Sequence, residues 1–151
     1  IVDKKILSLL QADVTLPLSE IAKRVGISKT PCWNRIRKME EGGIITNKIA
    51  ILDSSKINIP ITVFLSISVS SHTKEWIKKF FDTVTQYKQI IEVYRITGSD
   101  IDYLLKIVSS SIEEYDRFQQ QLISEIEFNK MSSSIALKEI KKLNSLPLDY
   151  I

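Results

Sequence analysis

Residues 17–43 read PLSEIAKRVGISKTPCWNRIRKMEEGG, and this stretch decides the fold of the first third of the chain. Its apolar residues recur at the spacing that buries one face of a helix, at Leu18, Ile21, Ala22 and Val25. Pro17 suits the first turn of this helix, because an amide there has no intrahelical partner. Gly26 is expected to end it, since glycine accepts a left-handed turn. An earlier helix, capped by Asp3, is predicted from a similar stripe at Ile6, Leu7 and Leu10.

A third helix is predicted to begin after Ser28, a residue type favoured at the N-cap. Because Pro31 has no N–H, the Ser28 hydroxyl is expected to accept the amide of Thr30. The core-facing stripe of this helix is Cys32, Ile36 and Met39. The opposite face is then polar and basic, and the glycines at 42–43 end the helix.

Two short helices joined by a tight glycine turn form a helix-turn-helix, whose second helix lies in the major groove of DNA. Residues 21–39 contain six Lys and Arg residues and no acidic residue, the charge expected of a phosphate-binding surface. The residues predicted to bind double-stranded DNA are Ser28, Lys29, Thr30, Trp33, Asn34, Arg35, Arg37 and Lys38. Thr30 and Asn34 are expected to reach base edges, whereas the lysines and Arg35 hold phosphates. The alternative is a three-helix structural domain with a solvated basic surface.

The hydrophobic pattern changes period after residue 60. Residues 61–69 alternate between apolar and smaller polar side chains, which predicts a strand with one apolar face. Helices are predicted over 74–86 and 112–125, and further strands over 90–97, 101–109 and about 131–140. The order β-α-β-β-α-β is a ferredoxin-like unit with both helices on one face of a four-stranded sheet.

The predicted fold class is α+β, with three parts in the chain. Residues 1–45 form a helix-turn-helix, winged-helix-like DNA-binding domain, and residues 46–59 form a linker. β-Branched residues predict a strand over 44–53 within this connection. Residues 60–151 form a ferredoxin-like domain for effector binding and oligomerisation. The strand at 101–109 is apolar on both faces, so we expect a homodimer that covers the second face and presents two recognition helices to paired half-sites.

The composition disfavours several other classes of protein. Cys32 and His72 are the single cysteine and the single histidine, which is too few for an intramolecular disulfide or the usual zinc sites. We therefore expect no metal and no cofactor. No apolar run approaches the ~20 residues that span a bilayer, so no membrane partner is expected. Sparse cysteine fits a reducing cytoplasm, which is the expected location.

The sequence resembles the Lrp/AsnC family of transcription regulators, also called leucine-responsive or feast/famine regulators, along essentially its whole length. The similarity is densest in residues 27–45, ISKTPCWNRIRKMEEGGII, and resumes at residues 100–106 and 137–141. Trp33 departs from the family pattern, where smaller aliphatic residues are common. Its ring is expected to pack either on the DNA backbone or on the first helix.

This resemblance implies an effector site. Family members bind an amino acid in the second domain, called RAM, and their dimers often assemble into octamers. The resemblance places the site in the loop of Thr97, Gly98, Ser99, Asp100, Ile101 and Asp102. Backbone amides of such a loop can hold a carboxylate and an aspartate can balance an ammonium, although the two aspartates can instead simply shape the hairpin. Ser99 departs from the family pattern, which has glycine directly before the first aspartate.

Three functions compete at this point. The preferred one is a sequence-specific DNA-binding transcription regulator that responds to an amino acid and controls amino-acid metabolism. The alternative is a small-molecule-binding regulatory module that acts on an enzyme, but such a module has no need of an acid-free basic helix. An enzyme is disfavoured, because no nucleophile–base set, phosphate loop or metal cluster is visible in the sequence.

Overall fold

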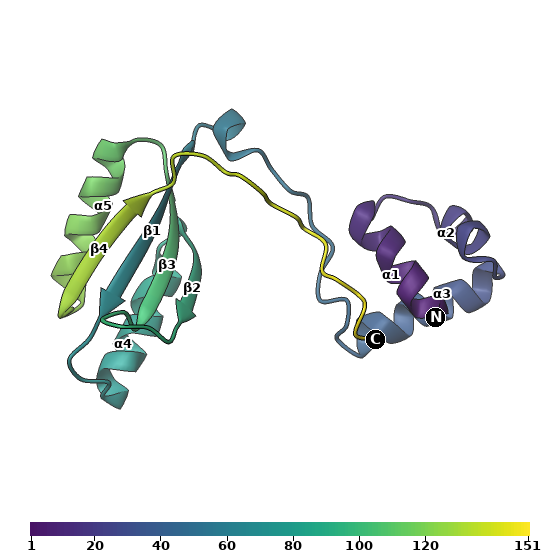
Figure 1. The fold of residues 1–151 in the computed structure, drawn as a ribbon, viewed down its shortest axis with the longest axis horizontal. Coiled ribbons are helices and arrows are strands. Elements are labelled where there is room, and N and C mark those ends of the chain that lie inside the picture. The colour runs from purple at the N-terminus through teal and green to yellow at the C-terminus, as the bar shows by residue number, and fades with distance from the viewer. The chain divides into compact units, whose positions relative to one another are not determined.

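The computed structural model describes all of residues 1–151, which divide into two compact units (Figure 1). Residues 1–51 and 140–151 form the helical unit, and residues 52–139 form the sheet unit. The expected division kept residues 140–151 with the second domain, whereas the structure groups them with the first. No helix combines the length and the apolar character needed to cross a bilayer.

Three helices build the helical unit: α1 (Val2–Ala12), α2 (Leu18–Val25) and α3 (Lys29–Glu41). Their buried side chains form one cluster, and all belong to the predicted stripes: Ile6, Leu7, Ile21, Ala22, Cys32, Ile36 and Met39. Asp3 is not the cap of α1 but lies in its first turn, where a negative charge also stabilises the positive helix end. Pro17 is the N-cap of α2 and not a first-turn residue. Burial raises the pKa of the Cys32 thiol, which therefore stays protonated in the core.

The turn between α2 and α3 is the predicted glycine turn. Gly26 has a φ of +83°, and its amide donates to the carbonyl of Ala22 at 2.9 Å. The amide of Ile27 donates to the same carbonyl at 3.1 Å. A Cβ at Gly26 would meet no atom within 4 Å, so a substitution there strains the backbone without a steric clash. The angle between the two helices thus depends on a left-handed residue at position 26.

The C-terminal tail completes the helical unit, which the sequence did not predict. The side-chain amide of Gln11 donates to the carbonyl of Leu146 at 3.1 Å, and its oxygen accepts the Leu146 amide at 2.7 Å. One side chain therefore bonds both backbone groups of Leu146, much as a paired strand residue does. Leu148 then packs against the buried cluster of the three helices. Both ends of the chain contribute to this unit.

The expected strand over 44–53 is absent. Residues 46–53 are extended but form no ladder, and a short 3₁₀ turn, η1 (Ser54–Ile57), follows with Asp53 as its cap. Four large apolar side chains of residues 44–53 are more than half exposed: Ile44, Ile49, Ile51 and Leu52. Ile45 instead packs against the buried cluster of the helical unit. β-Branched residues favour an extended backbone, but a strand also requires a hydrogen-bonded neighbour, and no other segment of this chain supplies one.

The sheet unit has the predicted β-α-β-β-α-β order. Its antiparallel sheet, ordered β2-β3-β1-β4, consists of β1 (Ile61–Ser68), β2 (Ile90–Arg95), β3 (Tyr103–Ser109) and β4 (Lys130–Ile135). The helices α4 (Lys74–Gln86) and α5 (Ile112–Glu125) both pack on one face of it. The centre of the core between sheet and helices is Val63, Leu65, Ile67, Phe80, Leu105, Ile107 and Leu122. β4 ends five residues earlier than the expected residue 140.

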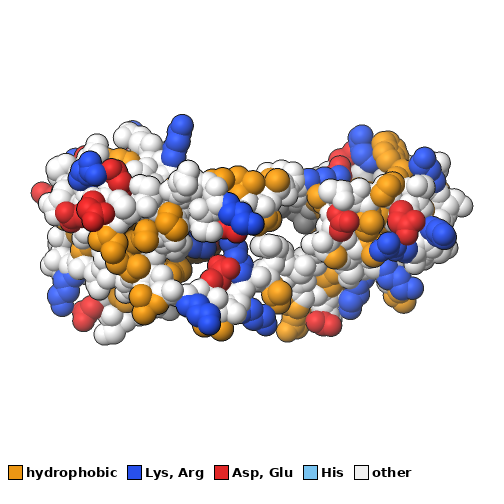
Figure 2. Space-filling model, turned by 90° about the horizontal axis from the view of Figure 1, so that it is seen from above, with side chains coloured by type: hydrophobic (Ala, Val, Ile, Leu, Met, Phe, Trp, Pro, Cys, Tyr) orange, Lys and Arg blue, Asp and Glu red, His pale blue; other side chains and the backbone are white.

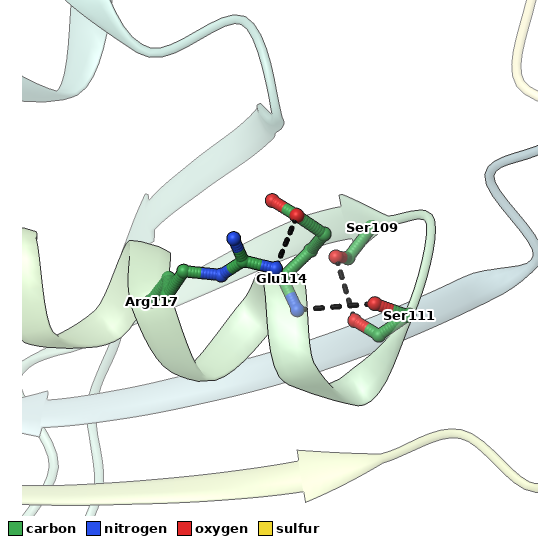
Figure 3. A network of polar contacts seen from close by, with 4 residues as sticks. All are labelled: Ser109, Ser111, Glu114 and Arg117. Carbon is green, nitrogen blue, oxygen red and sulfur yellow. Dashed lines mark hydrogen bonds and ion pairs between the residues drawn. The ribbon is translucent and has the colours of Figure 1, made fainter.

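A capped turn sets the start of α5 (Figure 3). The Ser111 hydroxyl accepts the amide of Glu114, and the Ser109 hydroxyl donates to the Ser111 carbonyl at 2.9 Å. The Glu114 carboxylate pairs with Arg117 on the next turn of the helix. A serine cap followed three residues later by glutamate is a common signal for a helix start. Here the capped turn connects the end of β3 to the start of α5.

The second face of the sheet carries no helix. Leu104 lies between Tyr94 and Ser66 on this face, and Val108 lies opposite Thr62. Leu104 and Val108 are half-buried, which agrees with the prediction that β3 is apolar on both faces. This face also contains an ion pair, in which the Lys106 ammonium lies 3.4 Å from the Glu92 carboxylate. The face is therefore mixed in character, with apolar side chains on the central strands.

Candidate DNA-binding surface and effector loop

The outer face of α3 gathers the residues predicted to bind DNA. The buried Cys32, Ile36 and Met39 fix which side of the helix faces the core. All eight predicted residues are exposed: Ser28, Lys29, Thr30, Trp33, Asn34, Arg35, Arg37 and Lys38. At ~100° per residue, Thr30 and Asn34 lie directly opposite the buried stripe. Figure 2 shows basic and acidic side chains interleaved over the helical unit, at the right of the view.

Ser28 is the N-cap of α3, but its hydroxyl does not cap the helix. The residue has the extended backbone of a cap, and its carbonyl accepts the Cys32 amide at 3.2 Å. The predicted hydrogen bond from the Thr30 amide to the hydroxyl is wrong. A serine cap commonly bonds the third amide of the helix, and here that position is Pro31, which has none. The amides of Lys29 and Thr30 thus remain without intrahelical partners at the positive end of the helix, where a phosphate binds favourably.

The arginines of the basic window are all paired with acids that lie outside it. Arg24 pairs with Glu20, Arg35 with Asp3 on α1, and Arg37 with Glu41, at N···O distances of 2.8, 3.1 and 2.8 Å. The Arg24 guanidinium holds the pKa of the Glu20 carboxyl below its usual value. The lysines of the same window form no ion pair: Lys23, Lys29 and Lys38. The uncompensated charge of this surface therefore resides on lysines.

Two of these three pairs were visible in the sequence, and one was not. Glu20 precedes Arg24, and Arg37 precedes Glu41, by four residues, the spacing at which helix side chains meet. The contact between Asp3 and Arg35 joins residues 32 positions apart and needs the packing of α1 against α3. Arg35 therefore braces two helices, in addition to the phosphate contact predicted for it.

The loop of residues 97–102 lies at the end of the sheet where β1 ends and β3 begins. Asp102 ties the loop to β1, because its amide donates to the Ile67 carbonyl at 2.8 Å. Its carboxylate also accepts the Val69 amide at 2.8 Å. The Ile96 amide in turn donates to the Asp102 carbonyl at 2.9 Å and closes the loop. Asp102 is thus held by backbone groups on both sides.

The exposed part of the loop consists of Thr97, Gly98, Ser99 and Asp100, whereas Ile101 and Asp102 are half-buried. The left-handed residue of the turn is Asp100, with a φ of +60°, and Gly98 has no positive φ. An aspartate tolerates this conformation, so the turn forms with serine at position 99. The carboxylate that faces solvent is that of Asp100. No group of three or more His, Cys, Asp or Glu side chains forms a candidate metal site.

A hollow that the sequence did not predict lies at the same end of the sheet unit. It has a volume of 860 Å³ and is lined by residues 69–71 and 73, the start of α4, Ile123 of α5 and residues 126–131. Trp76 forms part of its wall, and the indole N–H donates to the carbonyl of Glu127 at 2.9 Å. The lining comes from two segments that lie far apart in the sequence, so no local motif marks the hollow.

Two family models match the chain. A winged helix-turn-helix DNA-binding domain matches residues 1–46, and the Lrp/AsnC ligand-binding domain matches residues 62–146. The chain belongs to the Lrp/AsnC family. As a Lrp/AsnC protein it is a DNA-binding transcription regulator with a ligand-binding domain, and the predicted resemblance, fold class and main function are confirmed.

Curated and solved relatives span nearly the full Lrp/AsnC chain. The glutamate uptake regulatory protein of Zymomonas mobilis is 41% identical over 97% of this chain and 88% of its own length. The DNA-binding transcriptional activator DecR of Escherichia coli K12 is 35% identical over 98% and 97%. An AsnC family transcriptional regulator from Agrobacterium tumefaciens superposes with a TM-score of 0.94 at 47% identity, covering 99% of this chain and 97% of its own. A transcriptional regulator from Neisseria meningitidis in complex with L-Met gives 0.93 at 30% identity, covering 99% and 96%.

Replacing Asp102 with alanine is expected to destabilise the sheet unit by about 1.5–3 kcal/mol, since the Val69 amide loses a charged acceptor. Asp102→Asn keeps an acceptor oxygen and should lose less than half of that free energy. Asp100→Asn, at the exposed left-handed position, serves as the matched control and should be nearly neutral. Urea unfolding measures all three free energies. An Asp102→Ala chain that loses no more free energy of unfolding than Asp100→Asn would contradict the hydrogen bond between Asp102 and Val69 as a stabilising contact.

Proposed function

We propose that this regulator binds operator DNA through the outer face of α3 and changes its assembly when an amino acid binds at the 97–102 loop. The observation that carries the first part is the exposed face of α3, where polar and basic residues lie opposite a fully buried stripe. The winged helix-turn-helix match over residues 1–46 favours this function over a regulatory module that acts on an enzyme.

The proposed residue roles follow from positions on α3. Thr30 and Asn34 lie at the centre of the outer face and read base edges, because Asn pairs with adenine through two hydrogen bonds. Lys29 and Lys38 hold phosphates and position the helix, together with the first-turn amides that Ser28 leaves uncapped. Arg35 lies on a flank of α3 and Arg37 on its outer face, and each is already paired with a carboxylate.

The proposed assembly is a homodimer that covers the second face of the sheet. The half-buried Leu104 and Val108 lie on this face without a helix above them, and a twofold packing of sheets removes them from water. A dimer also presents two copies of α3 to paired half-sites about one helical turn apart, or a multiple of it. We propose that dimers assemble further, up to an octamer.

The proposed effector is an amino acid. The ligand-binding domain match over residues 62–146 includes the loop, and a solved relative from Neisseria meningitidis is a complex with L-Met. In this chain the exposed Asp100 carboxylate would balance the ammonium, since Asp102 is engaged with Val69. We propose control of amino-acid metabolism in the cytoplasm, without an enzymatic activity, in line with relatives named as regulators.

Sedimentation of the full chain with and without a panel of amino acids tests the assembly and the effector together. The expected result is an oligomer whose mass changes with one amino acid, and Asp100→Asn should weaken that response. A mass that ignores the whole panel, with wild-type chain and variant alike, would contradict effector-gated assembly. A monomer at all concentrations would contradict the dimer.

Lys38→Ala is expected to weaken binding to all DNA sequences alike and to lower the slope of log K against log salt by about one unit per bound subunit. The reason is the loss of one phosphate contact and its released counterion. Lys78→Ala removes the same charge from α4 of the sheet unit and is the matched control. Fluorescence anisotropy at several salt concentrations measures the slope, and an unchanged slope for Lys38→Ala would exclude a phosphate contact.

A further inference from the structure

Trp33 is a large apolar side chain whose exposure the fold does not explain. Its side chain lies on α3 and the residue is 48% exposed. It belongs neither to the buried cluster of the helical unit nor to the half-buried residues packed against it. Of the two packings predicted for Trp33, the one on the first helix is therefore not supported by the core of this unit, and the one on the DNA backbone stays a prediction. The half-exposed indole therefore leaves a ring face free for a partner at the surface of the helix.

That partner is Arg37, one turn further along α3. The guanidinium carbon of Arg37 lies over the Trp33 ring, 5.1 Å from its centroid. On its other side the guanidinium donates to the Glu41 carboxylate at 2.8 Å. The three residues are spaced by four, so Trp33, Arg37 and Glu41 form a row along one side of the helix. The guanidinium is thus held from both sides at the solvent surface.

We propose that Trp33 is a positioning residue, which holds the Arg37 guanidinium over its indole face so that it meets a DNA phosphate or guanine already ordered. This inference rests on the proposed role of α3. A free arginine loses rotamer freedom when it binds, and an arginine stacked on an aromatic face has lost part of that freedom beforehand. The indole can hold the cation without using the N–H donors that must bind the DNA.

Glu41, the last residue of this row, acts on DNA binding in the direction opposite to Trp33. Its carboxylate occupies an N–H donor of Arg37 and adds a negative charge beside the DNA-facing surface. When Arg37 binds DNA, this exposed ion pair must exchange for the new contact. Both partners are exposed, with side chains 52% and 67% accessible, so the exchange is easy but not free. Glu41 therefore weakens DNA binding, whereas Trp33 strengthens it, through the same guanidinium.

A double-mutant cycle on the full chain tests the proposal, with operator affinity as the readout. Trp33→Leu is expected to lower the affinity by about 3- to 10-fold, because Arg37 loses both the cation–π contact and the side-chain order that this contact provides. The same substitution in an Arg37→Ala chain is expected to have almost no effect. Trp33→Phe keeps an aromatic face and should restore part of the loss. Glu41→Gln should raise the affinity by about 2- to 5-fold, and only when Arg37 is present.

The outcomes separate this inference from the proposed function. If Arg37→Ala weakens binding but Trp33→Leu weakens it equally in both backgrounds, Trp33 contacts DNA itself and the positioning role is wrong, while the role of α3 stands. If Arg37→Ala has no effect on operator affinity, both the role of Arg37 on DNA and the positioning role are wrong. Thermal unfolding of each variant shows whether the helical unit is folded, and a Trp33→Leu chain that unfolds is replaced in the cycle by Trp33→Phe, whose loss must also vanish without Arg37.

Discussion

Asn34→Ala is expected to lower affinity for the operator by about 10- to 100-fold per half-site, because a two-point contact with adenine contributes roughly 1–3 kcal/mol. Affinity for unrelated DNA should stay within about twofold, since phosphates supply most of that binding. Asn34 lies at the centre of the exposed face of α3, and no intramolecular hydrogen bond or ion pair of its side chain is present to be lost. The change is therefore not expected to alter folding. Competition titrations with operator and random duplexes measure the two affinities.

Asn47→Ala is the matched control for this prediction. Asn47 lies just outside α3, and its side chain accepts only the backbone amide of the following residue, at 2.8 Å. It should leave both affinities unchanged. An Asn34→Ala chain that binds operator and random DNA with the same loss would contradict base reading by Asn34 and assign it to the backbone of the DNA.

Deleting residues 146–151 is expected to destabilise the helical unit by about 2–3 kcal/mol, through two hydrogen bonds to Gln11 and the packing of Leu148. For a unit of this size the loss corresponds to a fall in Tm of roughly 10 °C or more. DNA affinity should fall with it at temperatures near the transition. Circular dichroism at 222 nm during thermal unfolding measures the effect.

Leu146→Ala is the matched control for the tail. The Leu146 side chain is 74% exposed, and its contacts with Gln11 are made by backbone groups that alanine retains. The substitution should be nearly neutral, whereas Gln11→Ala should reproduce part of the loss. A deletion that leaves the thermal transition of the helical unit unchanged would show that the tail is not part of it.

Local periodicity predicted the parts of the fold that depend on neighbours in sequence. The three helices follow from apolar residues three and four apart, and the turn at Gly26 follows from the need for a left-handed residue. The sheet unit was predictable for the same reason, because alternation along β1 and β3 places Val63 and Leu105 on one face. The hairpin of β2 and β3 and the helices α4 and α5 were therefore predicted with nearly correct ends.

Most of the features that the sequence did not predict depend on contacts between residues that are far apart in the chain. The strand expected over 44–53 failed because β-branched residues fix only an extended backbone, and no partner strand exists in the chain. The docking of Leu148 joins the chain end to α1–α3 without any local motif. One local interaction was also predicted wrongly. The Ser28 hydroxyl was expected to accept the Thr30 amide, but Ser28 has only the backbone conformation of an N-cap.

Each candidate site likewise has features that the local sequence predicts and features that only the folded structure reveals. Helical phase alone predicted that Thr30 and Asn34 are exposed on one side of α3, and the structure agrees. The pairing of Arg35 with Asp3 required the fold, and it changes which charges remain available to DNA. In the 97–102 loop, the sequence offered two equivalent aspartates, and only the structure distinguishes the tethered Asp102 from the exposed Asp100.

Binding-site selection from a pool of random DNA duplexes tests the central claim most directly, namely that α3 reads DNA sequence in a paired arrangement. The account predicts that the full chain enriches a twofold-symmetric motif whose half-sites are centred about 10 base pairs apart, or a multiple of that spacing. Selection with Asn34→Ala should lose one conserved position in each half-site and keep the spacing. The same motif enriched by both chains, or no motif enriched by the wild-type chain, would contradict the account.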